Sequence, residues 1–142
     1  LLAQTEWKNK LGITRELEAM EFKVLVKKRH DGAFEMARDG FIADYNDATN
    51  FLALIRCDSD QNNNFNCNRK GEELIVQGER STDAAKRRQL LTQAAKLIME
   101  DYPIIPLVQY SLPRLVKSYV GGYWLQNAQD RFRSKDLYII KH

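Results

Sequence analysis

The sequence predicts an α/β fold, because helical and extended patterns follow one another along the chain. Apolar and polar residues alternate over 13–18 and again over 34–38, as they do in half-buried strands. Between these two segments, apolar residues recur at helical spacing over 22–30. A length of 142 residues and a hydrophobic fraction of 44% suit about one domain with a packed core.

The first two helices have recognisable ends. A helix over 1–11 is expected to end at Gly12, because glycine readily adopts the left-handed conformation that closes helices. The helix over 22–30 is followed by Asp31 and Gly32, a typical turn pair.

The middle of the chain predicts short helices between polar loops. A loop over 39–47 precedes a short apolar helix over 49–55. The asparagine-rich segment 57–70 predicts an exposed loop, and a short helix is expected over 72–78.

A long helix is expected after Ser81-Thr82-Asp83, a segment with N-cap chemistry, and should run to about residue 101. Its apolar stripe consists of Leu91, Ala94, Ala95, Ile98 and Tyr102. Prolines bracket an extended segment over 104–110, and a basic tail begins at Pro113.

Composition argues against several classes of function. No apolar run reaches the roughly 20 residues that a transmembrane helix needs. A net charge of +3 is small for a dedicated nucleic-acid binder, although aromatic residues interleave with the basic tail. The two histidines and two cysteines lack the paired spacing of zinc sites, and no phosphate-binding or hydrolase motif occurs. We therefore expect no metal, no cofactor and no nucleic-acid partner.

The two cysteines, Cys57 and Cys67, flank the polar loop. A disulfide between them would close a loop of about ten residues and stabilise the fold by about 2–3 kcal/mol. It requires an oxidising compartment, and two reduced thiols are the alternative. A hydrolase that used Cys57 with His30 is a weaker hypothesis, because no local signature supports that pair.

Three charged residues are candidates for binding. Arg29 ends a helix, where the dipole favours a cation, and is either solvated or available to a carboxylate. Arg38 ends an apolar strand, where a charged side chain is unexpected unless it has a structural or binding role. Asp44 lies in an apolar and aromatic run, where it could cap a helix, pair with Arg38 or bind a cation.

Three runs around these residues carry a family resemblance. They are Glu21-Phe22-Lys23, the segment 29–47 and Asn50-Phe51-Leu52. Together they closely resemble the periplasmic oligopeptide-binding protein family, the solute-binding subunits of peptide ABC transporters. The segments 114–123 and 136–142 resemble the last residues of the same proteins.

The resemblance implies the C-terminal part of a two-lobed periplasmic-binding-protein fold of the type II-like class, with a mixed sheet flanked by helices. Residues 1–111 would belong to the ligand-binding third domain, and 112–142 would return to the first domain. The signal peptide would lie outside this fragment, and the parent protein would be periplasmic in a Gram-negative cell. In that compartment, Cys57 and Cys67 are expected to form a disulfide.

The implied function is the capture of short peptides and their delivery to the membrane permease of an ABC importer, without catalysis. The partners would be peptides, the permease and the rest of the parent chain. The same scaffold binding murein tripeptide or another specialised peptide is the alternative.

Roles for the ligand-binding residues follow from the same resemblance. Asp44 would pair with the α-amino group of the peptide, and Arg29 and Arg38 would help to bind its carboxylate. Backbone groups of Gly40 and Ile42 would bond the peptide backbone.

The aromatic residues Phe22 and Phe41 would wall side-chain pockets. Tryptophan is common in the family at both positions, so the pockets here would differ in size. Ala48 replaces a common proline, and the cysteine pair is not part of the general family pattern.

Overall fold

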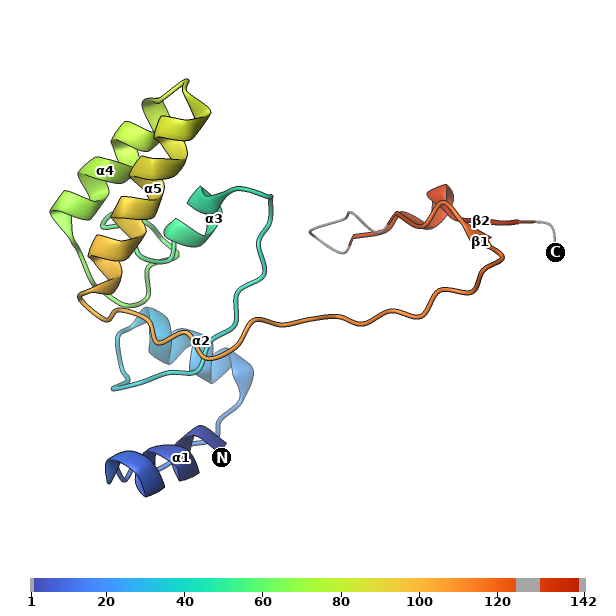
Figure 1. Cartoon of the computed structure of the whole chain (residues 1–142). Coiled ribbons are helices and arrows are strands. Elements are labelled where there is room, and N and C mark those ends of the chain that lie inside the picture. Colours follow the sequence, from blue (N-terminus) through green and yellow to red (C-terminus); the bar gives the residue numbers. More distant parts are fainter. Residues whose placement is uncertain (1, 125–130, 141–142) are drawn as a thin grey trace. The chain divides into compact units, whose positions relative to one another are not determined.

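The computed structural model describes residues 2–124 and 131–140. The chain divides into two compact units, Leu1–Ala37 and Arg38–His142, which we describe separately. Figure 1 shows the helices and strands in chain order. Lys141 and His142, the end of the C-terminal resemblance, lie outside the described residues.

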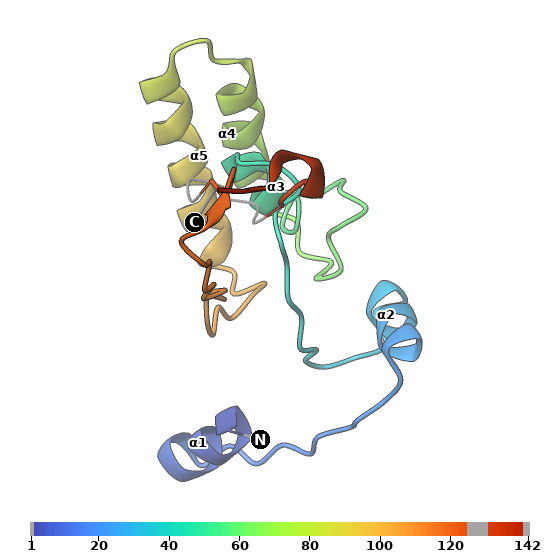
Figure 2. The ribbon, with the colours of Figure 1, turned by 90° about the vertical axis from the view of Figure 1, so that its right-hand side faces the viewer.

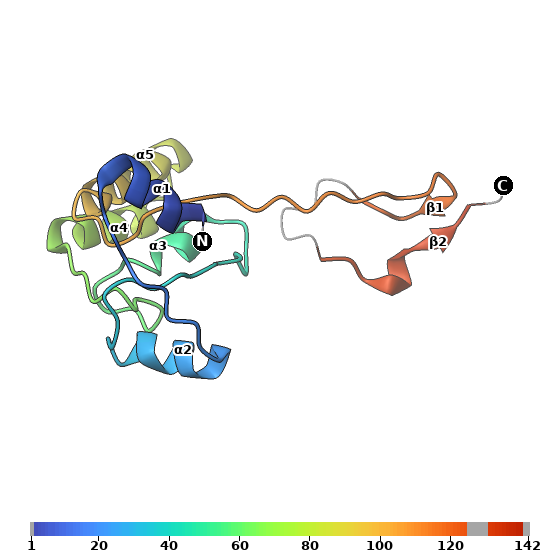
Figure 3. The same ribbon diagram turned by 90° about the horizontal axis from the view of Figure 1, so that it is seen from below.

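The first unit contains two separate helices, α1 (Leu2–Leu11) and α2 (Phe22–His30), joined by an extended segment (Figure 3). Gly12 has φ +69° and ends α1, as the sequence predicts. Gly32 has the same φ and donates its N–H to the carbonyl of Arg29, which closes α2. Neither helix has a buried residue within the described structure.

The prediction of strands over 13–18 and 34–38 is wrong. Both segments lack the backbone hydrogen bonds to a neighbouring strand that define a β-sheet. Alternation indicates a half-buried strand only where another strand accepts its backbone bonds. Among the described residues, the sheet is the antiparallel pair of β1 (Val120–Gly121) and β2 (Tyr138–Ile139).

The second unit is built on three helices, α3 (Ala48–Leu52), α4 (Arg69–Arg80) and α5 (Ala84–Met99). Helices α4 and α5 form an antiparallel hairpin, and α3 packs against α5 (Figures 1 and 2). Helix α3 is shorter than the predicted 49–55, and α4 is longer than the predicted 72–78. The core consists of Leu52, Ile55, Ile75, Leu91, Ala94 and Ile98.

Helix α5 follows its prediction closely at its start and departs from it at its end. The Asp83 side chain accepts hydrogen bonds from the N–H groups of Ala85 at 2.8 Å and Lys86 at 3.2 Å, so it is the N-cap. Tyr102 is 81% exposed and does not extend the apolar stripe. The helix ends at Met99, and Tyr102 has φ +54°, which turns the chain away from the helix axis.

Small residues let α4 and α5 approach each other closely. A Cβ atom on Gly71 would overlap the side chain of Ile98, and one on Gly78 would lie 2.8 Å from Leu91. Both apolar partners are buried, so they have little room to move.

A polar network holds the loop between α3 and α4. Cys57 and Cys67 form a disulfide with their Cα atoms 4.5 Å apart, in agreement with the expected pair. Arg56 donates to Glu72 at 2.7 Å and to Glu79 at 2.8 Å, and these carboxylates raise its pKa. The loop is therefore tied to one face of α4.

Candidate functional site

The loop over 39–47, which contains most of the predicted ligand-binding residues, is anchored at its end by Asp47. One carboxylate oxygen of Asp47 accepts from the N–H of Thr49 at 2.9 Å and from its hydroxyl at 2.7 Å, so Asp47 is the N-cap of α3. The same oxygen accepts from Nη2 of Arg87 on α5 at 2.8 Å. The hydrogen bond from Arg87, followed by those from Thr49, holds the pKa of Asp47 well below its usual range. Asp47 thus joins the loop, α3 and α5.

Asp44 combines a fixed backbone with an exposed carboxylate. Its N–H donates to the side-chain oxygen of Asn50 at 2.7 Å, and Asn50 is only 3% exposed. The side chain of Asp44 is 65% exposed, and its carboxylate lies 3.6 Å from Nη2 of Arg131. Asp47, not Asp44, caps α3, so the cap interpretation of Asp44 is wrong. The carboxylate is placed where it can meet a cation that arrives from solvent.

Arg38 lies beside Tyr110, from the extended segment that follows α5. Nη2 of Arg38 donates to the phenolic oxygen of Tyr110 at 3.1 Å. A Cβ atom on Gly40 would lie 3.6 Å from the Tyr110 ring, so this ring also faces the Gly40 backbone. The N–H of Gly40 donates to the Asp39 side chain at 2.7 Å. A ligand that used this N–H would therefore have to displace the Asp39 carboxylate.

The aromatic part of the loop packs on α3. Phe41 and Phe51 form an edge-to-face pair with ring centroids 5.5 Å apart. Ile42 is exposed between the half-buried Phe41 and Ala43. A hollow of about 300 Å³ adjoins this segment. It is lined by Ala43, Tyr45, Asn46, Asp47, Ala48, Phe51 and Gln109.

Phe22 and Arg29 belong to the first unit. Phe22 is the first residue of α2 and is exposed, and Arg29 is half-buried in the last turn. They lie about two turns apart on the same helix, and their roles toward a ligand stay predictions.

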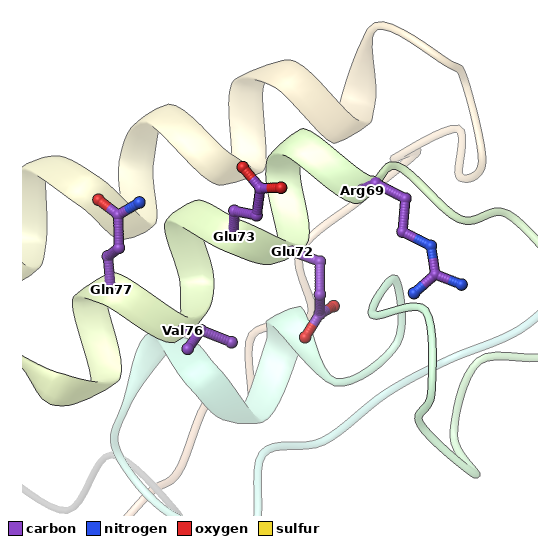
Figure 4. Close-up of a pocket in the computed structure, with 5 residues that line it drawn as sticks. All are labelled: Arg69, Glu72, Glu73, Val76 and Gln77. Carbon is purple, nitrogen blue, oxygen red and sulfur yellow. The ribbon is translucent and has the colours of Figure 1, made fainter.

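A second hollow, of about 430 Å³, runs along α4 (Figure 4). It is lined by Arg69, Glu72, Glu73, Val76 and Gln77. None of the predicted ligand-binding residues contributes to it, and Glu72 is already bonded to Arg56. It therefore adds nothing to the binding residues of the loop.

The structure also bears on the other hypotheses. Cys57 is in a disulfide, so its thiol cannot serve as the nucleophile of the hydrolase alternative. Within residues 2–124 and 131–140, no three metal-binding side chains cluster. No helix in the same described ranges has the length and apolar character to cross a membrane.

Three residues of this site have no role assigned from the sequence. The sequence Asp47-Ala48-Thr49 has the character of an N-cap and could have identified Asp47. Asn50 lies between Thr49 and Phe51 and has no local pattern that predicts its burial. Tyr110 has no local signal, because its partner Arg38 lies 72 residues earlier.

The chain is similar to curated proteins that are named as periplasmic binding proteins. It is 40% identical over 138 residues to the probable deoxycholate-binding periplasmic protein YgiS of Escherichia coli, across 97% of this chain and 26% of that protein. It is 38% identical over 136 residues to the periplasmic oligopeptide-binding protein OppA of Salmonella typhimurium, across 96% of this chain and 25% of that protein. The chain spans about a quarter of the length of these relatives.

Solved structures show the same relationship, although no protein-family model matches the chain. OppA of Burkholderia pseudomallei is 55% identical with a TM-score of 0.85, over 98% of this chain and 28% of that one. The murein tripeptide binding protein MppA of Escherichia coli is 30% identical with a TM-score of 0.83, over 99% of this chain and 28% of that one. These likenesses confirm the predicted fold class, part of a two-lobed periplasmic binding protein. In sequence and in fold, the chain belongs to the periplasmic oligopeptide-binding protein family and corresponds to about the C-terminal quarter of its members.

Proposed function

We propose that the chain is part of a solute-binding protein that captures short peptides and delivers them to the permease of an ABC-type importer. The parent protein would act in the periplasm of a Gram-negative cell, the compartment named for its relatives. Residues 1–111 would belong to the ligand-binding third domain and 112–142 to the first domain. The protein would bind and release its ligand without chemical change.

The exposed carboxylate of Asp44 on a fixed backbone carries this proposal. The hydrogen bond from the Asp44 N–H to the buried side chain of Asn50 fixes the backbone from which the Asp44 carboxylate projects. The Asp44 side chain itself is 65% exposed to solvent. A carboxylate so placed suits the α-ammonium group that every unmodified peptide carries. The ammonium group of a peptide would therefore meet a carboxylate whose backbone is already in place.

The hydrolase alternative loses its nucleophile with the Cys57–Cys67 disulfide, and the relatives are named as binding proteins. We therefore propose binding without catalysis. Two other ligands have a specific basis in the names of relatives, deoxycholate for YgiS and murein tripeptide for MppA. Deoxycholate is an anion without an ammonium group, so Asp44 would repel it rather than hold it.

The experiment is a titration of the full-length parent protein, stripped of bound ligand, with tri- to pentapeptides. Each peptide is supplied with a free and with an acetylated amino terminus, and deoxycholate and murein tripeptide are titrated in parallel. We expect the free peptides to bind at least about a hundredfold more tightly than the acetylated ones, the loss that follows when one partner of a buried charge pair is removed. Equal affinity for both forms, or tight binding of deoxycholate alone, would refute the proposal.

A further inference from the structure

Asn50 stands out because it is a polar side chain that is buried in the second unit. It is 3% exposed on α3, near the buried Leu52. A buried amide is costly unless its polar atoms are bonded. Its side-chain oxygen accepts the N–H of Asp44 at 2.7 Å, six residues earlier in the chain. The buried Asn50 side chain thus presents an acceptor to the backbone of Asp44, the residue with the exposed carboxylate.

A second contact fixes the helix on which Asn50 lies. Asp47 caps α3, and its carboxylate is bonded to Arg87 of α5 at 2.8 Å. Helix α5 forms the hairpin with α4 that contains most of the core. The contacts therefore run without a break from the hairpin through Asp47 and α3 to Asn50, and from Asn50 to Asp44.

We infer that Asn50, supported by the Asp47–Arg87 ion pair, is a positioning residue that holds the Asp44 carboxylate ready for the amino terminus of the ligand. This inference rests on the proposed function. A carboxylate on a loose loop would have to be ordered when the ligand binds, and that ordering would weaken binding. The Asn50 bond removes this cost in advance, because it fixes the backbone from which the Asp44 side chain projects.

The inference differs in its consequences from a purely structural role for Asn50. A structural role would affect free and acetylated peptides equally, because both depend on the fold. A positioning role affects only the contact with the ammonium group. The quantity to measure is therefore the ratio of the Kd for the acetylated peptide to the Kd for the free peptide.

The test uses Asn50→Ala in the full-length parent protein, with Asn64→Ala as a matched control. Asn64 is a half-buried asparagine whose amide donates to the carbonyl of Leu54 at 2.9 Å. Asn50→Ala should lower the ratio about tenfold, the effect of one unmade buried hydrogen bond. Asn64→Ala should leave the ratio unchanged. An unchanged ratio in folded Asn50→Ala would overturn the inference.

A second variant keeps the test decisive if Asn50→Ala does not fold. Arg87→Gln alters a half-buried side chain and releases the Asp47 carboxylate. It should lower the ratio about threefold, as expected for the loss of a partly exposed ion pair. An unchanged ratio in this variant would count against the inference. If the wild-type protein itself shows no difference between the two peptides, the proposed function fails, and that outcome is distinct from failure of the Asn50 variants.

Discussion

Replacing Asp44 by asparagine should separate ligand binding from stability. The substitution keeps the size of the side chain and the backbone N–H that bonds Asn50, and it removes only the charge. Without ligand, the carboxylate faces Arg131 at 3.6 Å, and the two side chains are 65% and 64% exposed. Ion pairs with this exposure contribute about 0–1 kcal/mol, so the free energy of unfolding should change by no more than that.

The expected effect on binding is larger because a bound peptide would exclude water from the carboxylate. Two unit charges about 4 Å apart interact by about 4 kcal/mol at an effective dielectric constant of about 20. Subtracting about 1 kcal/mol for the contact with Arg131 leaves about 3 kcal/mol, or roughly two orders of magnitude in Kd. The substitution should therefore weaken binding far more than it weakens the fold.

The assay is isothermal titration of the full-length protein with a free tripeptide, together with thermal unfolding of the same samples. Asp60→Asn is the matched control, because it removes the same charge from an exposed aspartate that lies outside the loop over 39–47. The control should bind within about threefold of the wild type. If Asp44→Asn binds as tightly as the control does, the assignment of Asp44 to the ammonium contact is refuted.

Four further outcomes are expected. Asp47→Asn should destabilise the protein by about 0.5–1 kcal/mol at pH 7. The depressed pKa of Asp47 stabilises the fold above about pH 4, so this difference from wild type should shrink as the pH falls below that value in urea unfolding curves. Thiol titration of the unreduced, denatured protein should find no free thiol, and two would contradict the Cys57–Cys67 bond. Gly71→Ala should cost about 1–2 kcal/mol in the free energy of unfolding despite better helix propensity, because its Cβ meets the buried Ile98. The 142-residue chain alone should bind tripeptides far more weakly than the parent protein, since it spans about a quarter of its relatives, and comparable affinity in a titration would contradict the two-lobed mechanism.

Local chemistry explains which elements are predictable. The end of α1 at Gly12 and the start of α5 at Asp83 follow from groups within a few residues of each terminus. The strands expected over 13–18 and 34–38 do not form, because a strand depends on a partner segment and not on its own residues alone. Alternation describes two faces of a segment, but the hydrogen bonds of a strand come from another segment, and no such partner pairs with them in the described ranges.

The sequence by itself determined the end of α1 at Gly12, the position of the cysteine pair and the run around Asp44 that carries the family resemblance. The tertiary structure alone decided which distant groups support that run. Asp47 meets Arg87 from 40 residues away, and Arg38 meets Tyr110 from 72 residues away. Periodicity and capping depend on neighbours in the chain, whereas these contacts depend on how the fold of the second unit brings remote segments together.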